Sequence, residues 1–217
     1  MKILALDAAL GGFSAALDDG GGASIAVATG RQDALERGLD CVAELLASAG
    51  LRLRELDRLA VGIGPGSFTG VRIAIAYAKS LAYGAGLPLV GVSSYDALEP
   101  ERAPLPVLTV VRGRRGVICV RLRTDSAQAV ACGPAGEVLD QFLRGEPGLV
   151  HIAGNTEDVL SEIAERGWTV RVLPPRAAVP AAAIAQLART RVPSPSPHAL
   201  APDYGEAPMM TVPKMRS

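Results

Sequence analysis

Apolar residues in the first half of the chain follow two spacings, one typical of strands and one typical of helices. Short apolar runs at 2–7, 13–17 and 24–28 predict three strands joined by glycine-containing turns. Between 33 and 49 the apolar positions recur every three or four residues, which predicts an amphipathic helix ended by Gly50. Its apolar positions are Leu35, Leu39, Val42, Leu45, Leu46 and Ala49.

A second strand-to-helix unit follows the first helix. Residues 59–63 predict a buried strand, 69–83 a long helix and 89–92 the next strand. Small residues recur every four positions on the long helix, so another backbone can approach it closely: Gly70, Ala74, Ala78 and Ala82. A helix that is apolar around most of its circumference needs a second partner besides its own sheet. That partner is either the 33–49 helix or another protein.

A polar, proline-bearing stretch at 99–106 predicts a boundary between two lobes. We assign residues 1–99 to a first lobe, 100–192 to a smaller second lobe and 193–217 to a proline-rich tail, extended or disordered. Within the second lobe the pattern predicts strands at 107–111, 117–122, 127–131, 149–153 and 168–173, with a helix at 156–166. An alanine-rich helix at 180–189 could pack back onto the first lobe.

Composition favours a globular protein with a large core and does not favour direct binding to nucleic acid. Hydrophobic residues make up 49% of the chain and aromatic residues 4%, so small aliphatic side chains fill the core. The 22 basic and 22 acidic side chains cancel, which argues against a chain that grips RNA unaided. No apolar run reaches the length of a membrane span, and the start is too short and polar for a signal peptide. The odd number of cysteines favours reduced thiols in the cytoplasm: Cys41, Cys119 and Cys132.

The most informative stretch is the glycine-rich junction between the 59–63 strand and the long helix. Pro65 and Gly66 suit the centre of a type II turn, and Ser67 or Thr69 can cap the helix. Such a junction gathers backbone N–H groups at one point, as anion sites do. A tight connection without a ligand produces the same pattern. No Gly-Lys-Ser/Thr follows, so the loop is not a Walker motif.

This junction also carries a family resemblance. The run Gly64-Pro-Gly-Ser-Phe-Thr-Gly-Val-Arg72 resembles the signature of the TsaB (YeaZ) family, which is also called glycoprotease-like. The flanking segments Met1-Lys-Ile-Leu-Ala-Leu-Asp7 and Leu89-Val-Gly-Val-Ser-Ser94 are similar to that family's as well. The resemblance is specific over residues 1–99 and weak beyond them. It implies an α/β fold of the actin-like ATPase (ribonuclease H-like) class, with two lobes of which the second is reduced.

The resemblance further implies a non-catalytic scaffold subunit. TsaB proteins pair with TsaD and, together with TsaE, support the threonylcarbamoylation of the adenosine beside the anticodon of tRNA. We therefore expect a heterodimer with TsaD, indirect contact with tRNA, and a homodimer in isolation. No cofactor is expected on this chain alone, although the complex could hold ATP or ADP.

The expected partner surface lies on the two helices and the glycine-rich loop. Phe68 would be a buried anchor of the interface, and Arg72 would donate hydrogen bonds to partner carbonyls or carboxylates. The full set comprises Leu35, Leu39, Val42, Leu46, Gly66, Ser67, Phe68, Thr69, Gly70, Val71, Arg72, Ile75 and Lys79.

Catalytic constellations are sparse along the chain. The sequence has two histidines, His151 and His198, and neither has a second histidine four residues away, which disfavours a metal peptidase. A serine or cysteine nucleophile lacks a histidine base for the same reason. Asp7 ends the first strand, where actin-like ATPases place a metal- or phosphate-facing carboxylate, so it is a candidate vestigial nucleotide residue. Ala8 follows where TsaB relatives usually carry Thr, and a turn-capping role for Asp7 is the alternative.

The second lobe departs from the family pattern. Arg112, Arg114 and Arg115 form a basic cluster that suits either RNA contact or a solvated loop. The acidic and tyrosine residues that many relatives carry there are absent.

Two alternatives to the scaffold function stay open. One is an enzyme in its own right, either a glycoprotease-like peptidase or a stand-alone ATPase, and the other is a pure RNA-binding module.

Overall fold

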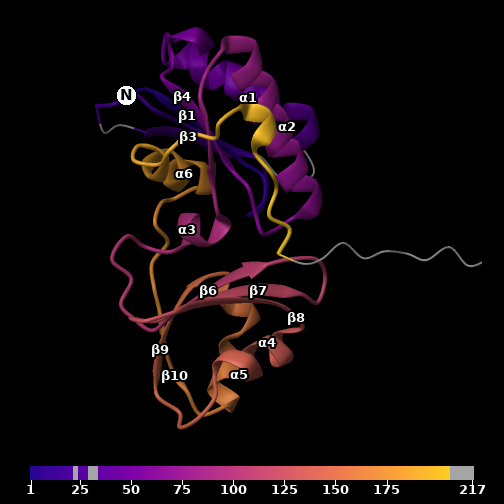
Figure 1. The fold of residues 1–217 in the computed structure, drawn as a ribbon, viewed down its shortest axis with the longest axis vertical. Coiled ribbons are helices and arrows are strands. Elements are labelled where there is room, and N and C mark those ends of the chain that lie inside the picture. Colours follow the sequence, from indigo (N-terminus) through magenta and orange to yellow (C-terminus); the bar gives the residue numbers. More distant parts are fainter. Residues whose placement is uncertain (22–23, 29–33, 206–217) are drawn as a thin grey trace, which may run out of the picture.

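Two five-stranded sheets, stacked one above the other, organise the chain (Figure 1). The structure is a computed structural model that describes residues 1–21, 24–28 and 34–205. The first sheet has the order β3-β2-β1-β4-β5, in which β1 is antiparallel to β2 and parallel to β4. Its strands are β1 (Ile3–Asp7), β2 (Ser14–Asp18), β3 (Ser24–Ala28), β4 (Arg58–Gly62) and β5 (Leu89–Val92).

The second sheet repeats this topology. Its order is β10-β9-β6-β7-β8, with β6 antiparallel to β7 and parallel to β9. Its strands are β6 (Val107–Arg112), β7 (Ile118–Arg123), β8 (Gln128–Gly133), β9 (Leu149–Gly154) and β10 (Thr169–Val172). A duplicated sheet of this order is the actin-like arrangement, so the expected fold class is confirmed.

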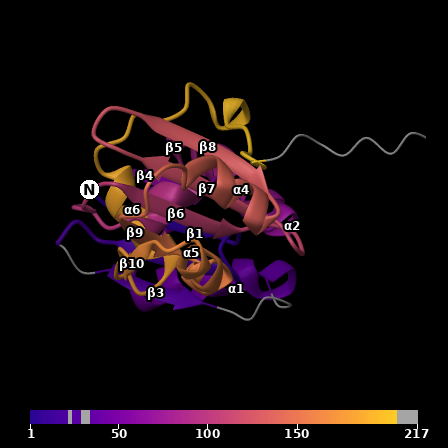
Figure 2. The same ribbon diagram turned by 90° about the horizontal axis from the view of Figure 1, so that it is seen from below.

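The second lobe is reduced in its helices and not in its strands. The first lobe carries α1 (Ala34–Ser48) and α2 (Phe68–Ala85), of 15 and 18 residues. The second lobe has α4 (Ala135–Phe142) and α5 (Leu160–Glu165), of eight and six residues, on the face of its sheet turned away from the first lobe (Figures 1 and 2). The short helix α3 (Ser94–Leu98) lies between the two sheets.

Both faces of the first sheet are covered by helices. Because side chains alternate along a strand, Leu4 and Leu6 of β1 pack with α1 and α2, while Ile3 and Ala5 pack on the other face. That other face is covered by α6 (Pro180–Ala188), whose alanines are buried against it. The first lobe is therefore built from two stretches of chain, with the second lobe inserted between them.

The residues after α6 return along the first lobe. We call residues 193–205 the C-terminal strap; they are extended apart from a 3₁₀ turn at Pro197–Ala199. The backbone N–H of Ser194 donates to the Leu89 carbonyl at 2.8 Å, and that of Asp203 donates to the Ile63 carbonyl at 2.7 Å. Leu200 packs against the core between the sheet and α2. The rest of the predicted tail, 206–217, lies outside the described residues.

Two short elements differ from the sequence prediction. Helix α4 was not predicted, because two turns offer too few apolar repeats to establish a period. The predicted helix at 156–166 is instead a 3₁₀ turn, Thr156–Asp158, followed by α5. Val159 is fully buried at the junction, so the chain turns there to place this side chain in the core of the second lobe.

The cysteines also differ from the sequence prediction. Cys119 of β7 and Cys132 of β8 lie directly opposite each other, with Cα atoms 4.1 Å apart, and form a disulfide. The prediction of reduced thiols is therefore wrong for this pair, while Cys41 is a buried free thiol. The pairing depends on the register of the β7–β8 hairpin, which cysteine spacing alone does not reveal.

Within the described parts of the chain, no helix combines the length and apolarity that crossing a membrane requires.

Candidate functional site

The glycine-rich loop joins β4 to α2 and packs on the loop after β1. Ser67 caps α2 as predicted: its Oγ accepts a hydrogen bond from the Gly70 N–H at 3.2 Å. The expected type II turn is not formed. The φ angle of Gly66 is +150°, where that turn needs about +80°.

Glycines let this loop sit directly on the neighbouring backbone. A Cβ atom on Gly66 would lie 2.4 Å from the Ala9 carbonyl oxygen, and one on Gly70 would lie 1.7 Å from the Ala8 carbonyl oxygen. The Ser67 N–H donates to the same Ala9 oxygen at 2.9 Å. The start of α2 is thus seated against protein backbone, and this N–H group is already used within the chain.

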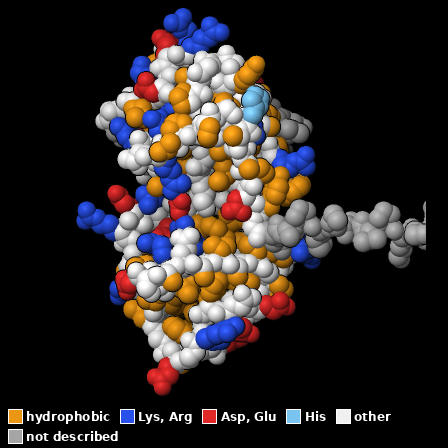
Figure 3. All heavy atoms as spheres, viewed as in Figure 1, with side chains coloured by type: hydrophobic (Ala, Val, Ile, Leu, Met, Phe, Trp, Pro, Cys, Tyr) orange, Lys and Arg blue, Asp and Glu red, His pale blue; other side chains and the backbone are white. Residues whose placement is uncertain are grey.

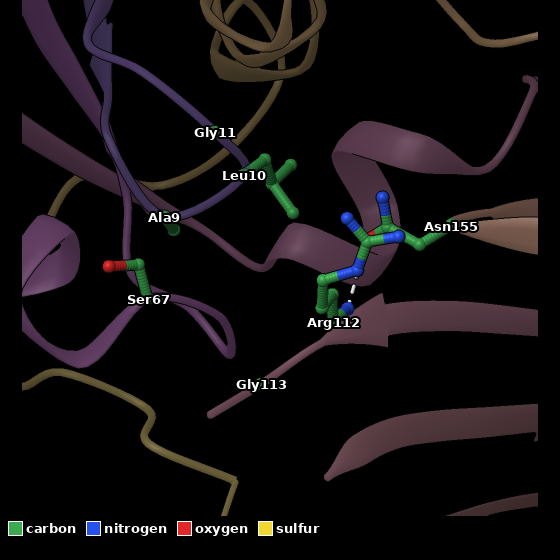
Figure 4. Close-up of a pocket in the computed structure, with 7 residues that line it drawn as sticks. All are labelled: Ala9, Leu10, Gly11, Ser67, Arg112, Gly113 and Asn155. Atoms are coloured by element: carbon green, nitrogen blue, oxygen red, sulfur yellow. Dashed lines mark hydrogen bonds between the residues drawn. The ribbon is translucent and has the colours of Figure 1, made fainter. Parts of the chain in front are cut away.

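A small cleft lies between the lobes beside this seat (Figure 4). The loop after β1, Ser67, and the end of β6 line it, together with Asn155, which accepts a hydrogen bond from the Arg112 N–H at 2.9 Å. Its volume is about 40 Å³. Pockets for small molecules and cofactors measure roughly 300–1,000 Å³. The cleft is therefore much smaller than a pocket of that kind.

Asp7 is buried beneath this region and does not line the cleft. One carboxylate oxygen accepts the Leu10 N–H at 3.1 Å, and the other is buried without a hydrogen-bond partner. Burial raises the pKa of Asp7 to about 6, although the backbone N–H groups of Leu10 and Ala9 partly offset it. Gly62 makes room for the unpaired oxygen, since a Cβ there would lie 2.1 Å from it.

Arg112, the first member of the basic cluster, is neutralised by neighbours in its own lobe. Its guanidinium group donates to Glu157 at 2.7 Å and to both carboxylate oxygens of Asp158 at 2.8 Å. These bonds raise the pKa of the guanidinium group further above its usual value, the hydrogen bond to Asp158 being the largest cause. Arg112 is thus positioned as part of an ion-pair cluster at the mouth of the cleft.

One edge of α2 presents apolar and aromatic side chains to solvent. Phe68 is 55% exposed and Tyr83 72% exposed, with Arg72 and Ala76 between them on the same stripe. Arg72 places its guanidinium group 5.4 Å from the centre of the Phe68 ring. Leu39 of α1 is also exposed, at 45%. We call Phe68, Arg72, Ala76 and Tyr83 the α2 stripe.

The structure divides the predicted interface residues into accessible and inaccessible ones. Three of them are buried in the first lobe's own core, where their side chains pack against the sheet: Val42, Val71 and Ile75. Gly70 is buried against Ala8. Leu46, Gly66, Ser67 and Lys79 are half-buried, and Leu39, Phe68, Thr69 and Arg72 are exposed. The side chain of Leu35 lies outside the described residues.

The strap supplies contacts that sequence reasoning missed. The Tyr204 ring lies 4.8 Å from the Phe68 ring, and the His198 ring lies 5.4 Å from that of Tyr83. Lys79 donates to the His198 carbonyl at 3.2 Å. The strap therefore borders the α2 stripe along its length. The exposed face of α2 could have revealed Tyr83, whereas nothing in the sequence brings Tyr204 to Phe68.

The two histidines lie in different lobes. His151, in β9, is within 3.3 Å of the Pro106 carbonyl, and His198 lies in the strap. Among the described residues, no group of three or more His, Cys, Asp or Glu side chains could hold a metal ion.

Comparison with known proteins gives one family match. A family model described as "TsaD: tRNA N6-adenosine threonylcarbamoyltransferase" matches residues 31–168, more than half of the 217 residues.

Two curated relatives carry names from the same system. A tRNA threonylcarbamoyladenosine biosynthesis protein TsaB from Escherichia coli (strain K12) is 43% identical over 94 residues, which cover 43% of this chain and 41% of the relative. A tRNA N6-adenosine threonylcarbamoyltransferase from Paracoccus denitrificans (strain Pd 1222) is 45% identical over 93 residues, covering 41% of this chain and 26% of the relative. The chain thus spans less than half the length of these relatives.

Solved structures show the same fold over nearly the whole chain. YeaZ from Pseudomonas aeruginosa superposes with a TM-score of 0.70 at 24% identity, covering 94% of this chain and 99% of that one.

Proposed function

This chain belongs to the TsaD family, and from that premise we propose that it is a non-catalytic scaffold subunit that pairs with TsaD in the threonylcarbamoylation of tRNA adenosine. The observation that carries the proposal is the α2 stripe, an apolar and aromatic surface that begins at the glycine-rich loop. Exposed apolar patches rimmed by polar groups mark protein-binding surfaces. The names of the TsaB and TsaD relatives support the choice of partner and pathway.

The stripe has the composition of a binding surface. Aromatic residues and arginine are enriched among the residues that carry most of the binding energy at interfaces. Phe68 and Tyr83 supply rigid apolar area at the two ends of the stripe, and Arg72 supplies hydrogen-bond donors between them. Without TsaD, we propose that the same surface joins two copies of this chain.

We assign nucleotide binding to the complex and not to this chain alone. The cleft of about 40 Å³ supports this division, since any ATP or ADP would need room from the partner. TsaE and tRNA would be reached through TsaD.

We also propose a cytoplasmic location, where tRNA is modified. The Cys119–Cys132 disulfide is unusual for that compartment. Alkylation of free thiols during lysis in denaturant tests the point, because the denaturant also exposes the buried Cys41: three modified cysteines fit the cytoplasm, whereas one modified cysteine contradicts it.

The main experiment pairs Phe68→Asp with a control at an exposed apolar residue outside the stripe. Val192 is 89% exposed, so Val192→Asp adds the same charge without touching α2. Each variant is co-purified with TsaD of the same organism, and the product is sized by light scattering. We expect wild type and Val192→Asp to form one-to-one heterodimers. Phe68→Asp should bind at least about tenfold more weakly, because its charge loses water on binding.

Two outcomes would contradict the proposal. Equal binding of TsaD by Phe68→Asp and wild type would remove the α2 stripe from the interface. A wild-type chain that does not bind TsaD at all would overturn the scaffold role and leave the enzymatic alternatives to be tested by ATP and peptide turnover.

A further inference from the structure

A cavity of about 270 Å³ lies at the waist of the molecule, where the chain crosses between the lobes. Figure 3 shows Lys and Arg side chains gathered at this waist with acidic ones among them. The cavity is separate from the cleft beside the glycine-rich loop, with which it shares no lining residue. Its charged lining is dominated by Asp96, Glu99, Arg121, Arg123, Arg176 and Arg191.

Arginines outnumber carboxylates in this lining. Four guanidinium groups face Asp96, Glu99 and the exposed Glu101, which leaves one positive charge in excess. Arg121 is the most buried of the four, at 8% side-chain exposure, and Glu99 is equally sheltered at 6%. The site is thus a built, partly enclosed arginine cluster, and not a set of solvated surface charges.

The two inner carboxylates have their oxygens occupied. Asp96 accepts from Arg121 on one oxygen and from Arg191 on the other. Glu99 accepts from Arg123 on one oxygen, and from Arg121 and Thr109 on the other, at 2.8 and 2.9 Å. These carboxylates therefore hold the arginines in place and have little capacity left for a further donor.

The arginines, by contrast, keep most of their donors. A guanidinium group has five N–H donors. Within the described chain, the side chains of Arg123, Arg176 and Arg191 each make one hydrogen bond: to Glu99, to the Glu99 carbonyl at 2.9 Å, and to Asp96. The arginines therefore keep more free donors than the occupied carboxylates of Asp96 and Glu99 keep free acceptors, which suits an anion.

We propose that this cavity binds a small phosphate-bearing anion between Arg123, Arg176 and Arg191. Planar guanidinium forks match the oxygens of phosphate groups and form strong charge-assisted bonds with them. The volume lies just below the range of cofactor pockets, so it admits a ligand of pyrophosphate size more readily than a dinucleotide. The inference is independent of the proposed pairing with TsaD, since none of these residues belongs to the α2 stripe.

The lining residues come from both lobes and from the crossings between them. Asp96 and Glu99 lie on the way out to the second lobe and Arg176 lies on the way back, whereas Arg191 follows α6 in the first lobe and Arg123 belongs to β7 in the second. An anion held by these arginines would therefore contact both lobes at once. Since it would bind the folded protein and not the unfolded chain, it should also raise the melting temperature, and increasingly so as its concentration rises above the Kd.

The test titrates inorganic pyrophosphate into the full chain by isothermal calorimetry at low ionic strength, with sodium sulfate at matched ionic strength as the competing anion. Arg176→Gln and Arg191→Gln are the test variants. Arg171→Gln, on the exposed side of β10, is the matched control. We expect one pyrophosphate per chain, a loss of about tenfold or more in affinity in each test variant, and no change in the control.

Arg176 keeps the test informative if Arg191→Gln unfolds, because its one hydrogen bond is to a backbone carbonyl and Asp96 keeps its partners. Circular dichroism melts check that each variant is folded. Failure of pyrophosphate to bind, or equal affinity in Arg176→Gln and Arg171→Gln, would overturn the proposal. Binding of a short RNA oligonucleotide that is lost in Arg176→Gln, without binding of pyrophosphate, would overturn it in favour of an RNA contact.

Discussion

Asp7 shows how much a single buried carboxyl group can influence this fold. Its position at the end of β1 is readable from the sequence, since an apolar strand ends there. Its full burial is not, because it depends on the later packing of α6, whose Ile184 and the Asp7 carboxylate both lie close to Gly62. The vestigial role assigned to Asp7 stays a prediction, and its unpaired oxygen makes its ionisation unfavourable in the folded state.

This ionisation cost predicts a pH dependence of stability. A folded-state pKa of about 6, against 3.8 for the free side chain, means that the folded protein binds the proton more tightly. The stabilisation that the protonated Asp7 contributes is fully present below pH 4 and is lost as pH rises through 6. The free energy of unfolding falls by about 3 kcal/mol over this range. Asp7→Asn removes the charge and keeps an acceptor for the Leu10 N–H. It should therefore be more stable than wild type at pH 7, with the difference shrinking towards pH 4.

Urea unfolding at pH 4, 5, 6 and 7 measures this difference. The exposed Asp125→Asn serves as the control for the loss of one negative charge. Parallel pH profiles for wild type and Asp7→Asn would show that ionisation of the buried Asp7 carboxyl group does not lower the stability of the protein.

Helix α2 illustrates what a sequence pattern can and cannot predict about an element. The apolar period predicted its existence, and of the two predicted caps, Ser67 and Thr69, the structure selects Ser67. The stripe of small residues suggested a close approach by another backbone, and the structure places Gly70 against the Ala8 carbonyl of the same chain. The pattern could not decide between these partners, because a small residue permits contact with any backbone that reaches it.

Two glycines in this helix give a matched pair of variants. Gly70→Ala would place its Cβ 1.7 Å from a backbone oxygen, so we expect a loss of about 3 kcal/mol or more in the free energy of unfolding. Gly84, in the last turn, has open space around it, and Gly84→Ala should gain about 0.5–1 kcal/mol from its higher helix propensity. Denaturant unfolding measures both changes in stability. Equal effects would mean that the Ala8 backbone moves to accommodate the added Cβ without loss of stability.

At the scale of the whole molecule, the lobes are held together by charges that no local pattern reveals. Arg121 of β7 bonds Asp96 of α3 and Glu99 just beyond it. Burial alone would raise the pKa of Asp96, but hydrogen bonds from Arg191 and Arg121 outweigh it and lower the pKa. The stabilisation from Asp96 is therefore present at neutral pH and is lost in acid. The carboxylates come from α3 and its C-terminal end, Arg121 from β7 and Arg191 from beyond α6, so sequence spacing gave no sign of the network.

Removing the central arginine should loosen the lobes. Arg121→Gln leaves two sheltered carboxylates with fewer donors, and we expect a loss of about 3 kcal/mol in the free energy of unfolding. Limited proteolysis should also cut faster within 99–106, the first crossing. The exposed Arg54→Gln is the control. Unchanged stability and unchanged cleavage in Arg121→Gln would show that the packing of α3 alone holds the lobes.

The insertion of the second lobe between the two parts of the first has a consequence for biosynthesis. While the ribosome has delivered only the first hundred residues, the face of β1 that carries Ile3 and Ala5 has no covering helix. That face is closed only after α6 has emerged, when the second lobe is already available to fold. The nascent first lobe therefore has one face of its sheet uncovered until the whole second lobe has been synthesised.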